Sequence, residues 1–173
     1  MPTILTFALI ANSLSAENAV SLQKPDADGW INLFNGKDLT GWDGDPKVWR
    51  VKDGYISGEI DKLEGGNTFL IFEKPFSNYI LELDVLLVGR KGNSGIQYRS
   101  KHSERGSNKW VVKGYQADFA NGCWGKLYEE GGRGALVWKY KDKAPAIKAN
   151  DGWNRYRITA SGSKLKQELN GAV

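Results

Sequence analysis

Residues 110–119 read WVVKGYQADF, and their second half alternates between apolar and polar side chains. In a β-strand Tyr115, Ala117 and Phe119 would point to one side, and Gln116 and Asp118 to the other. Similar short segments, rich in Val, Ile, Tyr, Phe or Trp and separated by Gly, Asn, Asp or Pro, recur along the chain and predict further strands. They are GWINLFN (29–35), VWRVKDG (48–54), YISGEI (55–60), NTFLIFE (67–73), YILELDVLLV (79–88), SGIQYRS (94–100), ALVWKY (135–140), WNRYRITAS (153–161) and KLKQELN (164–170).

This pattern predicts an all-β fold, built as a two-sheet antiparallel sandwich or jelly roll. The length of 173 residues suits one domain, and no helical periodicity extends beyond about two turns. Seven Trp, seven Tyr and 21 Gly fit a chain with many strands and turns better than a helical one.

The net charge of +4 is dispersed along the chain. Because no run of five or six Lys or Arg occurs, the charge predicts an ordinary solvated surface, and nucleic acid is not an expected partner. A single histidine, His102, and a single cysteine, Cys123, argue against a His/Cys zinc site and against an internal disulfide. No cofactor is required by the sequence, whereas an oxygen-ligated Ca²⁺ or other divalent ion remains open.

The N-terminus carries an apolar run, Ile4 to Ala11, followed by small residues up to Ala16. Residues 1–16 are therefore predicted to be a signal peptide, residues 17–28 a linker and residues 29–173 the β-sandwich domain. The run is too short for a transmembrane segment. These features predict a secreted or periplasmic protein, and the alternative is an N-terminal segment that packs partly on the domain.

The C-terminus ends on a turn signal, Asn170-Gly171, with only Ala172 and Val173 after it. Asn-Gly between apolar segments is a strong hairpin signal, and a hairpin without its second arm leaves an open sheet edge. We therefore expect the sequence to lack the last strand or strands of the sandwich.

Three predicted strands pair an apolar face with a face of planar polar groups. Such a face is either solvated or lined for a ligand. The polar side chains of this face can form bidentate hydrogen bonds, which suit the vicinal hydroxyls of a sugar. None of these side chains is a lysine. They are Glu82 and Asp84 in residues 79–88, Gln97 and Arg99 in residues 94–100, and Gln116 and Asp118 in residues 110–119.

Residues 120–134, ANGCWGKLYEEGGRG, are predicted to form a loop, because five of them are glycines. Trp124 and Tyr128 could stack on sugar C–H groups, and Glu130 and Arg133 could bond hydroxyls. Alternatively, the two rings close the edge of the core.

Two familiar catalytic patterns fail. The E-x-D-x-x-E motif of laminarinase-type glucanases would place an acid where Leu87 stands, so the paired carboxylates of a retaining glycosidase are not predicted. A Ser-His-Asp triad would depend on His102, which a loop-like segment carries.

The motifs LFNGKDLTGW (33–42), WRVKDGYISG (49–58), GNSGIQYRS (92–100), GYQADF (114–119), WGKLYEEGGRG (124–134) and WNRYRITASGSKLKQELNG (153–171) resemble, in this order, the 3-keto-disaccharide hydrolase family. The resemblance covers residues 29–173 and implies a concanavalin-like β-sandwich, exported by bacteria that degrade glycosides. It also implies further strands beyond the LNG hairpin. The first motif is interpreted as structural, with a turn at Asn35-Gly36, a short loop at 37–40 and Trp42 as an anchor.

The family activity implies elimination from a 3-keto sugar followed by hydration. On the matching positions, Asp118 is expected to be the general base, Arg99 and Gln116 to stabilise the oxyanion, and Glu130 to protonate the leaving group. The residues expected to position the substrate are Glu82, Asp84, Gln97, Trp124, Tyr128 and Arg133.

Two other functions remain open. One is a non-catalytic, lectin-like carbohydrate-binding module that uses the same polar and aromatic face. The other is a structural domain of a larger secreted protein. The sequence does not predict the oligomeric state, the sugar or the linkage.

Overall fold

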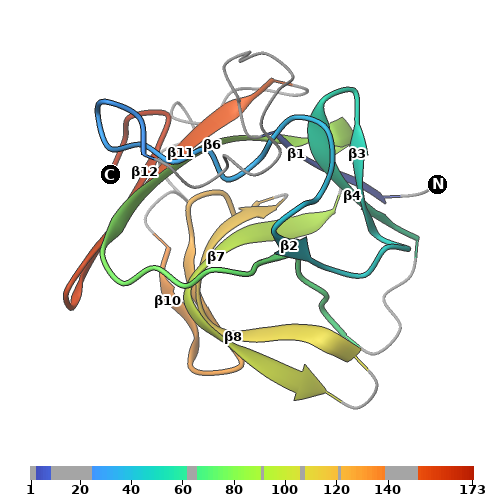
Figure 1. The fold of residues 1–173 in the computed structure, drawn as a ribbon. Helices are drawn as coiled ribbons and strands as arrows, with labels where there is room; N and C mark the ends of the chain where they lie inside the picture. The colour runs from blue at the N-terminus through green and yellow to red at the C-terminus, as the bar shows by residue number, and fades with distance from the viewer. Residues whose placement is uncertain are drawn as a thin grey trace.

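The computed structural model describes residues 3–8, 25–61, 66–90, 92–105, 108–120, 122–138 and 152–173. These residues form antiparallel sheets, two large and one small (Figure 1), which confirms the all-β prediction. Within the described ranges the only helical element is a single 3-10 turn, η1 (Val88–Arg90).

The larger sheet has six strands in the order β12-β11-β6-β1-β4-β3. Its longest strand, β6, pairs with β11 from Asn154↔Val85 to Ala160↔Tyr79. On its other side β6 pairs with β1, which in turn pairs with β4. The strands are β12 (Lys164–Leu169), β11 (Asn154–Ser161), β6 (Tyr79–Leu87), β1 (Thr3–Ala8), β4 (Tyr55–Ile60) and β3 (Trp49–Lys52).

The second sheet has four strands in the order β10-β9-β8-β7, and Figure 1 shows it below the first sheet. Its two long strands, β7 and β8, pair across most of their length. A two-stranded ladder, β2 with β5, completes the fold. The strands are β7 (Asn93–Arg105), β8 (Asn108–Ala120), β9 (Leu127–Glu130), β10 (Gly134–Val137), β2 (Trp42–Asp43) and β5 (Ile71–Phe72).

The main hydrophobic core lies between the two large sheets, as in a β-sandwich. The side chains that fill it come from alternate positions of their strands, as the strand period requires. Its buried members are Leu83, Val85 and Leu87 of β6, Ile96 and Tyr98 of β7, Ala117 and Phe119 of β8, Tyr156 and Ile158 of β11, and Leu169 of β12. The intervening residues of β7 and β8, among them Gln97, Gln116 and Asp118, therefore lie on the opposite face of the four-stranded sheet, its outer face.

Four predictions of local structure are wrong. His102, expected in a loop-like segment, lies in β7 and pairs with Val112. Residues 29–35, predicted as a strand, form none, and the strand predicted at 67–73 is reduced to the two residues of β5. The segment 120–134, predicted as a loop, contains β9 and the start of β10. Its glycines mark turns at both ends of β9 rather than one continuous loop.

The N-terminal segment is a strand where it is described. Residues 3–8 form β1, hydrogen-bonded between β4 and β6. The predicted cleavage zone around Ala16 and the linker up to residue 24 lie outside the described residues. Export therefore stays a prediction. Among the described residues, no helix has the length and apolar character needed to cross a membrane.

The C-terminal turn forms as predicted. Asn170 and Gly171 have positive φ angles of 50° and 82°, the pattern of a type I′ turn. Leu169 and Ala172 exchange two backbone hydrogen bonds across it, of 2.8 and 3.0 Å.

The motif at residues 33–42 is a structural loop. The side chain of Asn35 accepts hydrogen bonds from the backbone of Lys37 and Asp38, and Gly36 has a φ of 77°. The indole N–H of Trp42 donates to the carbonyl of Leu33. These bonds close the predicted turn at Asn35-Gly36 and anchor it on the ring of Trp42.

Candidate functional site

The outer face of the four-stranded sheet carries a continuous chain of side-chain hydrogen bonds. The Ser100 hydroxyl donates to Oε1 of Gln97 at 2.8 Å, and Nε2 of Gln97 donates to Oε1 of Gln116 at 2.9 Å. Nε2 of Gln116 then donates to Oδ1 of Asp118 at 2.5 Å. All three bonds point the same way, so the chain ends on the Asp118 carboxylate.

The chain leaves hydrogen-bonding capacity for a ligand. Each glutamine oxygen uses one of its two lone pairs, and each glutamine nitrogen uses one of its two N–H groups. Within the described part of the chain, Gln97 and Gln116 therefore each keep one N–H for a ligand. These two amides, called the donor row below, lie beside the Asp118 carboxylate. Their N–H groups suit a ligand that presents carbonyl or oxyanion oxygens.

The lack of a side chain at Gly95 leaves the space that the Gln116 side chain occupies. It lies opposite Asp118 in the register of β7 and β8, next to the pair formed by Gln97 and Gln116. A Cβ on Gly95 would lie 2.5 Å from Cδ and 2.9 Å from Nε2 of Gln116. The glycine is thus required for space at the centre of the donor row.

Asp118 is buried and has a cationic partner. Nζ of Lys126 lies 2.7 Å from Oδ2 of Asp118, and the two side chains are 14% and 4% exposed. The ammonium group also lies 5.1 Å from the ring centre of Tyr128 and 5.5 Å from that of Trp138, distances at which cation–π attraction operates. Sequence reasoning missed both Lys126 and Trp138.

The pKa of Lys126 is raised above its ordinary value. Burial by itself would lower it, but the hydrogen bond to Asp118 and the negative charge of that carboxylate outweigh burial, and Cys123 adds to the rise. Lys126 is therefore protonated at neutral pH.

Tyr128 and Glu130 lie on the same face as Gln116. In the register of β8 and β9, Tyr128 stands opposite Gln116 and Glu130 opposite Gly114. Glu130 accepts a hydrogen bond from the side chain of Asn67 at 3.3 Å. Five residues of the predicted site thus lie on one face of the four-stranded sheet, with Glu130 four residues along β8 from Asp118: Gln97, Gln116, Asp118, Tyr128 and Glu130.

Arg99 departs from this face. It has a positive φ of 50°, and the register of β7 shifts between Tyr98 and Lys101, which marks a β-bulge. Its guanidinium group donates to the side chain of Asn78 at 3.2 Å. Ser100 takes the place beside Gln97 that simple alternation predicts for Arg99.

Glu82 and Asp84 lie on the other sheet. They alternate with the core residues Leu83 and Val85, so their side chains point away from the sandwich interior. Asp84 forms a bidentate pair with Arg155, at 2.9 and 2.7 Å, and Glu82 forms an ion pair with Arg157. These acids therefore lie on a different sheet from Gln116, although residues of both sheets, Glu82 and Asp84 included, line the groove described below.

The remaining two candidates are also separate from the donor row. Trp124 packs on the core, with its ring centre 5.8 Å from that of Phe119, as the alternative interpretation of this ring expected. Arg133, in the turn after β9, forms an ion pair with Glu129, which alternates with Tyr128 and Glu130 and points to the other face.

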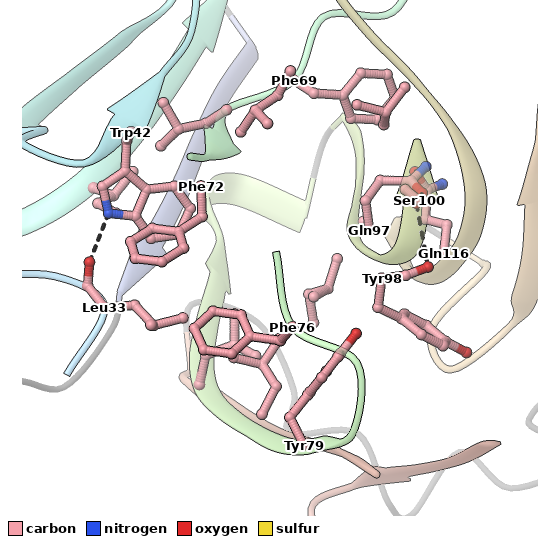
Figure 2. A pocket seen from close by; sticks show the side chains of 18 of the residues that line it. Leu33, Trp42, Phe69, Phe72, Phe76, Tyr79, Gln97, Tyr98, Ser100 and Gln116 are labelled. Carbon is pink, nitrogen blue, oxygen red and sulfur yellow. Dashed lines mark hydrogen bonds between the residues drawn. The ribbon is translucent and has the colours of Figure 1, made fainter. Parts of the chain in front are cut away.

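An open groove runs along β7 and reaches the donor row. Figure 2 shows Gln97, Ser100 and Gln116 at the right of it, Trp42 and Phe72 at the left, and Phe76 and Tyr79 below. The rings of Trp42 and Phe72 are 4.9 Å apart, and those of Phe72 and Phe76 are stacked at 6.0 Å. A ligand on the donor row would thus have an apolar aromatic wall nearby.

The residues that the structure describes include no group of three or more His, Cys, Asp or Glu side chains placed to hold a metal ion. The metal requirement stays open.

Comparisons with known proteins agree on one family. The model of the 3-keto-alpha-glucoside-1,2-lyase-like domain matches residues 29–173. A 3-keto-disaccharide hydrolase from Bacteroides thetaiotaomicron is 41% identical over 100 residues, which cover 51% of this chain and 33% of that protein. A crystal structure from Parabacteroides distasonis, of a protein assigned as a glycosyl hydrolase, is 26% identical with a TM-score of 0.58, and the match covers 84% of this chain and 70% of that one. The match to the curated relative thus spans a third of its length.

Proposed function

This chain belongs to the 3-keto-alpha-glucoside-1,2-lyase-like domain family, and from that premise we propose that it cleaves the glycosidic bond of 3-keto glycosides. The observation that carries the proposal is the donor row beside a carboxylate, formed by Gln97, Gln116 and Asp118. A 3-keto sugar would present a carbonyl oxygen to such donors and an acidified C–H bond to such a carboxylate.

The proposed reaction starts from a sugar that is already oxidised at C3. Asp118 takes the proton from C2, and the electrons of the C–H bond move into the C3 carbonyl to form an enolate. The enolate then forms a double bond between C1 and C2 while the C1–O bond breaks, and Glu130 gives a proton to the departing oxygen. Water adds across the double bond, with OH at C1 and H at C2, so the net reaction is hydrolysis.

Gln116 and Gln97 keep their proposed roles in this reaction. Their remaining N–H groups would hold the C3 oxygen as it gains negative charge, and Tyr128 would lie against the sugar ring. The other predicted site residues have no part in this chemical step, since their contacts are with other side chains: Arg99, Glu82, Asp84, Trp124 and Arg133. Arg99, Glu82 and Asp84 line the groove and stay proposed substrate-positioning residues.

The test is Asp118→Asn, assayed by the release of the leaving group from a 3-keto glucoside. Because a positioned base contributes about 100-fold or more, kcat should fall by at least that factor. Glu168→Gln is the matched control, because Glu168 is an ion-paired acid on the other sheet and its loss should leave kcat unchanged. Near-normal turnover by Asp118→Asn would exclude this residue as the base.

One observation favours a second function, a lectin-like binding module. Both carboxylate oxygens of Asp118 are already engaged, by Gln116 and by Lys126, as in a rigid sugar-binding surface. Isothermal titration with plain and 3-keto disaccharides separates the two functions. Binding of plain sugars without turnover of keto sugars would favour the module.

The proposal extends to the fold and the location of the protein. The sandwich is proposed to be of the concanavalin-like, jelly-roll type, as the family resemblance implies. Export to the periplasm or the medium is proposed from the apolar run at the N-terminus.

A further inference from the structure

The site contains a cation that differs from the expected one. Arg99 bonds Asn78, whereas Asp118 bonds Lys126. Lys126 is thus the positive charge in direct contact with the proposed base.

The backbone fixes Lys126 and Asp118 relative to each other. The N–H of Asp118 donates to the carbonyl of Lys126, and the N–H of Gly125 donates to the carbonyl of Asp118, both at 2.9 Å. The hydroxyl of Tyr156, a buried residue of the opposite sheet, donates to the Asp118 carbonyl at 2.7 Å and accepts from the Gly125 N–H at 3.0 Å. The ion pair is therefore preorganised by the core and does not depend on a mobile loop.

The environment of the pair strengthens its electrostatic effect. Both side chains are largely removed from water, so charge interactions are less screened than at the surface. Lys126 is the more exposed of the two, and a ligand on this face would meet its ammonium group before the Asp118 carboxylate. The rings of Tyr128 and Trp138 limit where the ammonium group can move.

The proposed reaction moves negative charge from Asp118 to the substrate. When the carboxylate takes the C2 proton it becomes neutral, and Lys126 loses its counter-ion. The enolate formed in the same step carries that negative charge on its C3 oxygen. A buried ammonium is costly without an anion, so its attraction should follow the charge from the carboxylate to the enolate.

We propose that Lys126 is a catalytic residue of this chain, which holds the Asp118 carboxylate in the resting site and stabilises the enolate oxygen as it forms. No proton leaves Lys126, since it acts only as a hydrogen-bond donor and a charge. This inference rests on the proposed function and deepens it. The alternative is a purely structural ion pair, whose loss lowers stability without a specific effect on the chemical step.

The experiment compares Lys126→Met with Lys166→Met in the full chain. Lys166 is also a lysine in an ion pair, with Glu168 at 3.1 Å on the other sheet, and neither residue lines the groove. Turnover of a 3-keto glucoside gives kcat and KM, and thermal melting reports stability. We expect Lys126→Met to lower kcat by about 100-fold with KM changed by less than about threefold, because the lost interaction acts mainly in the transition state. Lys166→Met should leave kcat unchanged, and the melting temperatures separate any loss of stability from a loss of turnover.

Lys126→Gln is the second variant, and it decides the question if Lys126→Met does not fold. Glutamine keeps a hydrogen-bond donor for Asp118 but carries no charge, so a similar loss of kcat would assign the effect to the charge. A folded Lys126 variant with kcat within threefold of the wild type would overturn the role of Lys126 and leave the proposed function standing. A wild-type chain that neither binds nor turns over 3-keto glycosides would overturn both.

Discussion

At the scale of single residues, the donor row depends on Gly95, because any side chain at this position would occupy the space of the Gln116 amide. Gly95 lies beneath the amide of Gln116, with no room for even a methyl group. Its φ angle is not in the left-handed region, so backbone conformation is not the reason for glycine here. Space for Gln116 is the reason, and this links a structural position to the proposed chemistry.

Gly95→Ala should therefore damage the site directly. The added methyl group would displace the Gln116 amide and break its bonds to Gln97 and Asp118. Because each hydrogen bond contributes about 0.5–1.5 kcal/mol, kcat/KM should fall about tenfold or more. Overpacking should also lower stability by about 1–3 kcal/mol, measured by urea unfolding. In a Gln116→Ala background the same change should cost little, since the clashing atoms are gone. An equal cost in both backgrounds would contradict this account.

The sequence could predict some of these residues and not others. Gln97, Gln116 and Asp118 follow strict alternation in β7 and β8, so their common face was predictable. Arg99 was not, because one extra residue in a bulge moves every later side chain to the other face. Lys126 was missed because it lies between glycine-rich turns. No alternation of apolar and polar residues there indicates which way its side chain points.

At the scale of elements, the bulge in β7 shapes the site. Its residues Arg99 and Ser100 lie against Gly114 of β8, which has a φ of 149°. The bulge turns Arg99 towards Asn78 and brings Ser100 to the start of the hydrogen-bond chain. One irregularity of pairing thus selects which side chains reach the donor row.

Gly114→Ala should be the more damaging of two glycine substitutions at positive φ. A Cβ at Gly114 would lie 2.6 Å from Cα of Ser100 and 2.8 Å from the carbonyl oxygen of Arg99, and backbone atoms cannot move aside easily. We expect a loss of about 3 kcal/mol or more in urea unfolding. At Gly171, with a φ of 82° and nothing within 4 Å, the same change should cost only about 1–2 kcal/mol for the backbone. Equal losses at the two positions would argue against the close packing of the bulge.

The elements themselves were predictable where their pattern was strong. β6, β8 and the hairpin of β11 and β12 match segments rich in β-branched and aromatic residues. β9 was not predictable, since LYEE has no alternation of its own and pairs only because β8 offers a partner. The sequence of residues 29–35 resembles a strand, but these residues form an irregular loop. Phe34 packs from this loop into a separate cluster of buried residues, with Val48, Trp49 and Ile56. Tertiary packing decided both cases.

At the scale of the whole molecule, two tyrosines tie the sheets together. Tyr156 crosses from β11 to the backbone of Asp118, and Tyr98 of β7 accepts a hydrogen bond from Gln167 of β12 at 2.8 Å. Both side chains are buried in the main core. The position of the donor row thus depends on how the two sheets pack, and the integrity of the site should follow global stability.

Tyr98 predicts how that stability changes with pH. Burial raises its pKa well above the ordinary value of about 10, and burial also raises the pKa of Tyr79. Below about pH 10 both the folded and unfolded chains keep these protons, so the stabilisation is fully present. As pH rises further, the unfolded chain loses its protons first, and the free energy of unfolding falls by up to about 1.4 kcal/mol per pH unit for each group.

Tyr98→Phe should therefore flatten the alkaline loss of stability. Near pH 8 it should lower the free energy of unfolding by about 1–2 kcal/mol, because Gln167 loses its partner inside the protein. Between pH 10 and 11 its unfolding free energy should fall less steeply than that of the wild type, by up to about 1.4 kcal/mol per unit. Tyr55→Phe is the matched control, since Tyr55 is 38% exposed and meets water in both states. Urea unfolding at pH 8, 10 and 11 measures how the unfolding free energy of the wild type and of each variant changes with pH. If this free energy fell equally steeply in Tyr98→Phe and in the wild type, Tyr98 would not be the buried group that limits alkaline stability.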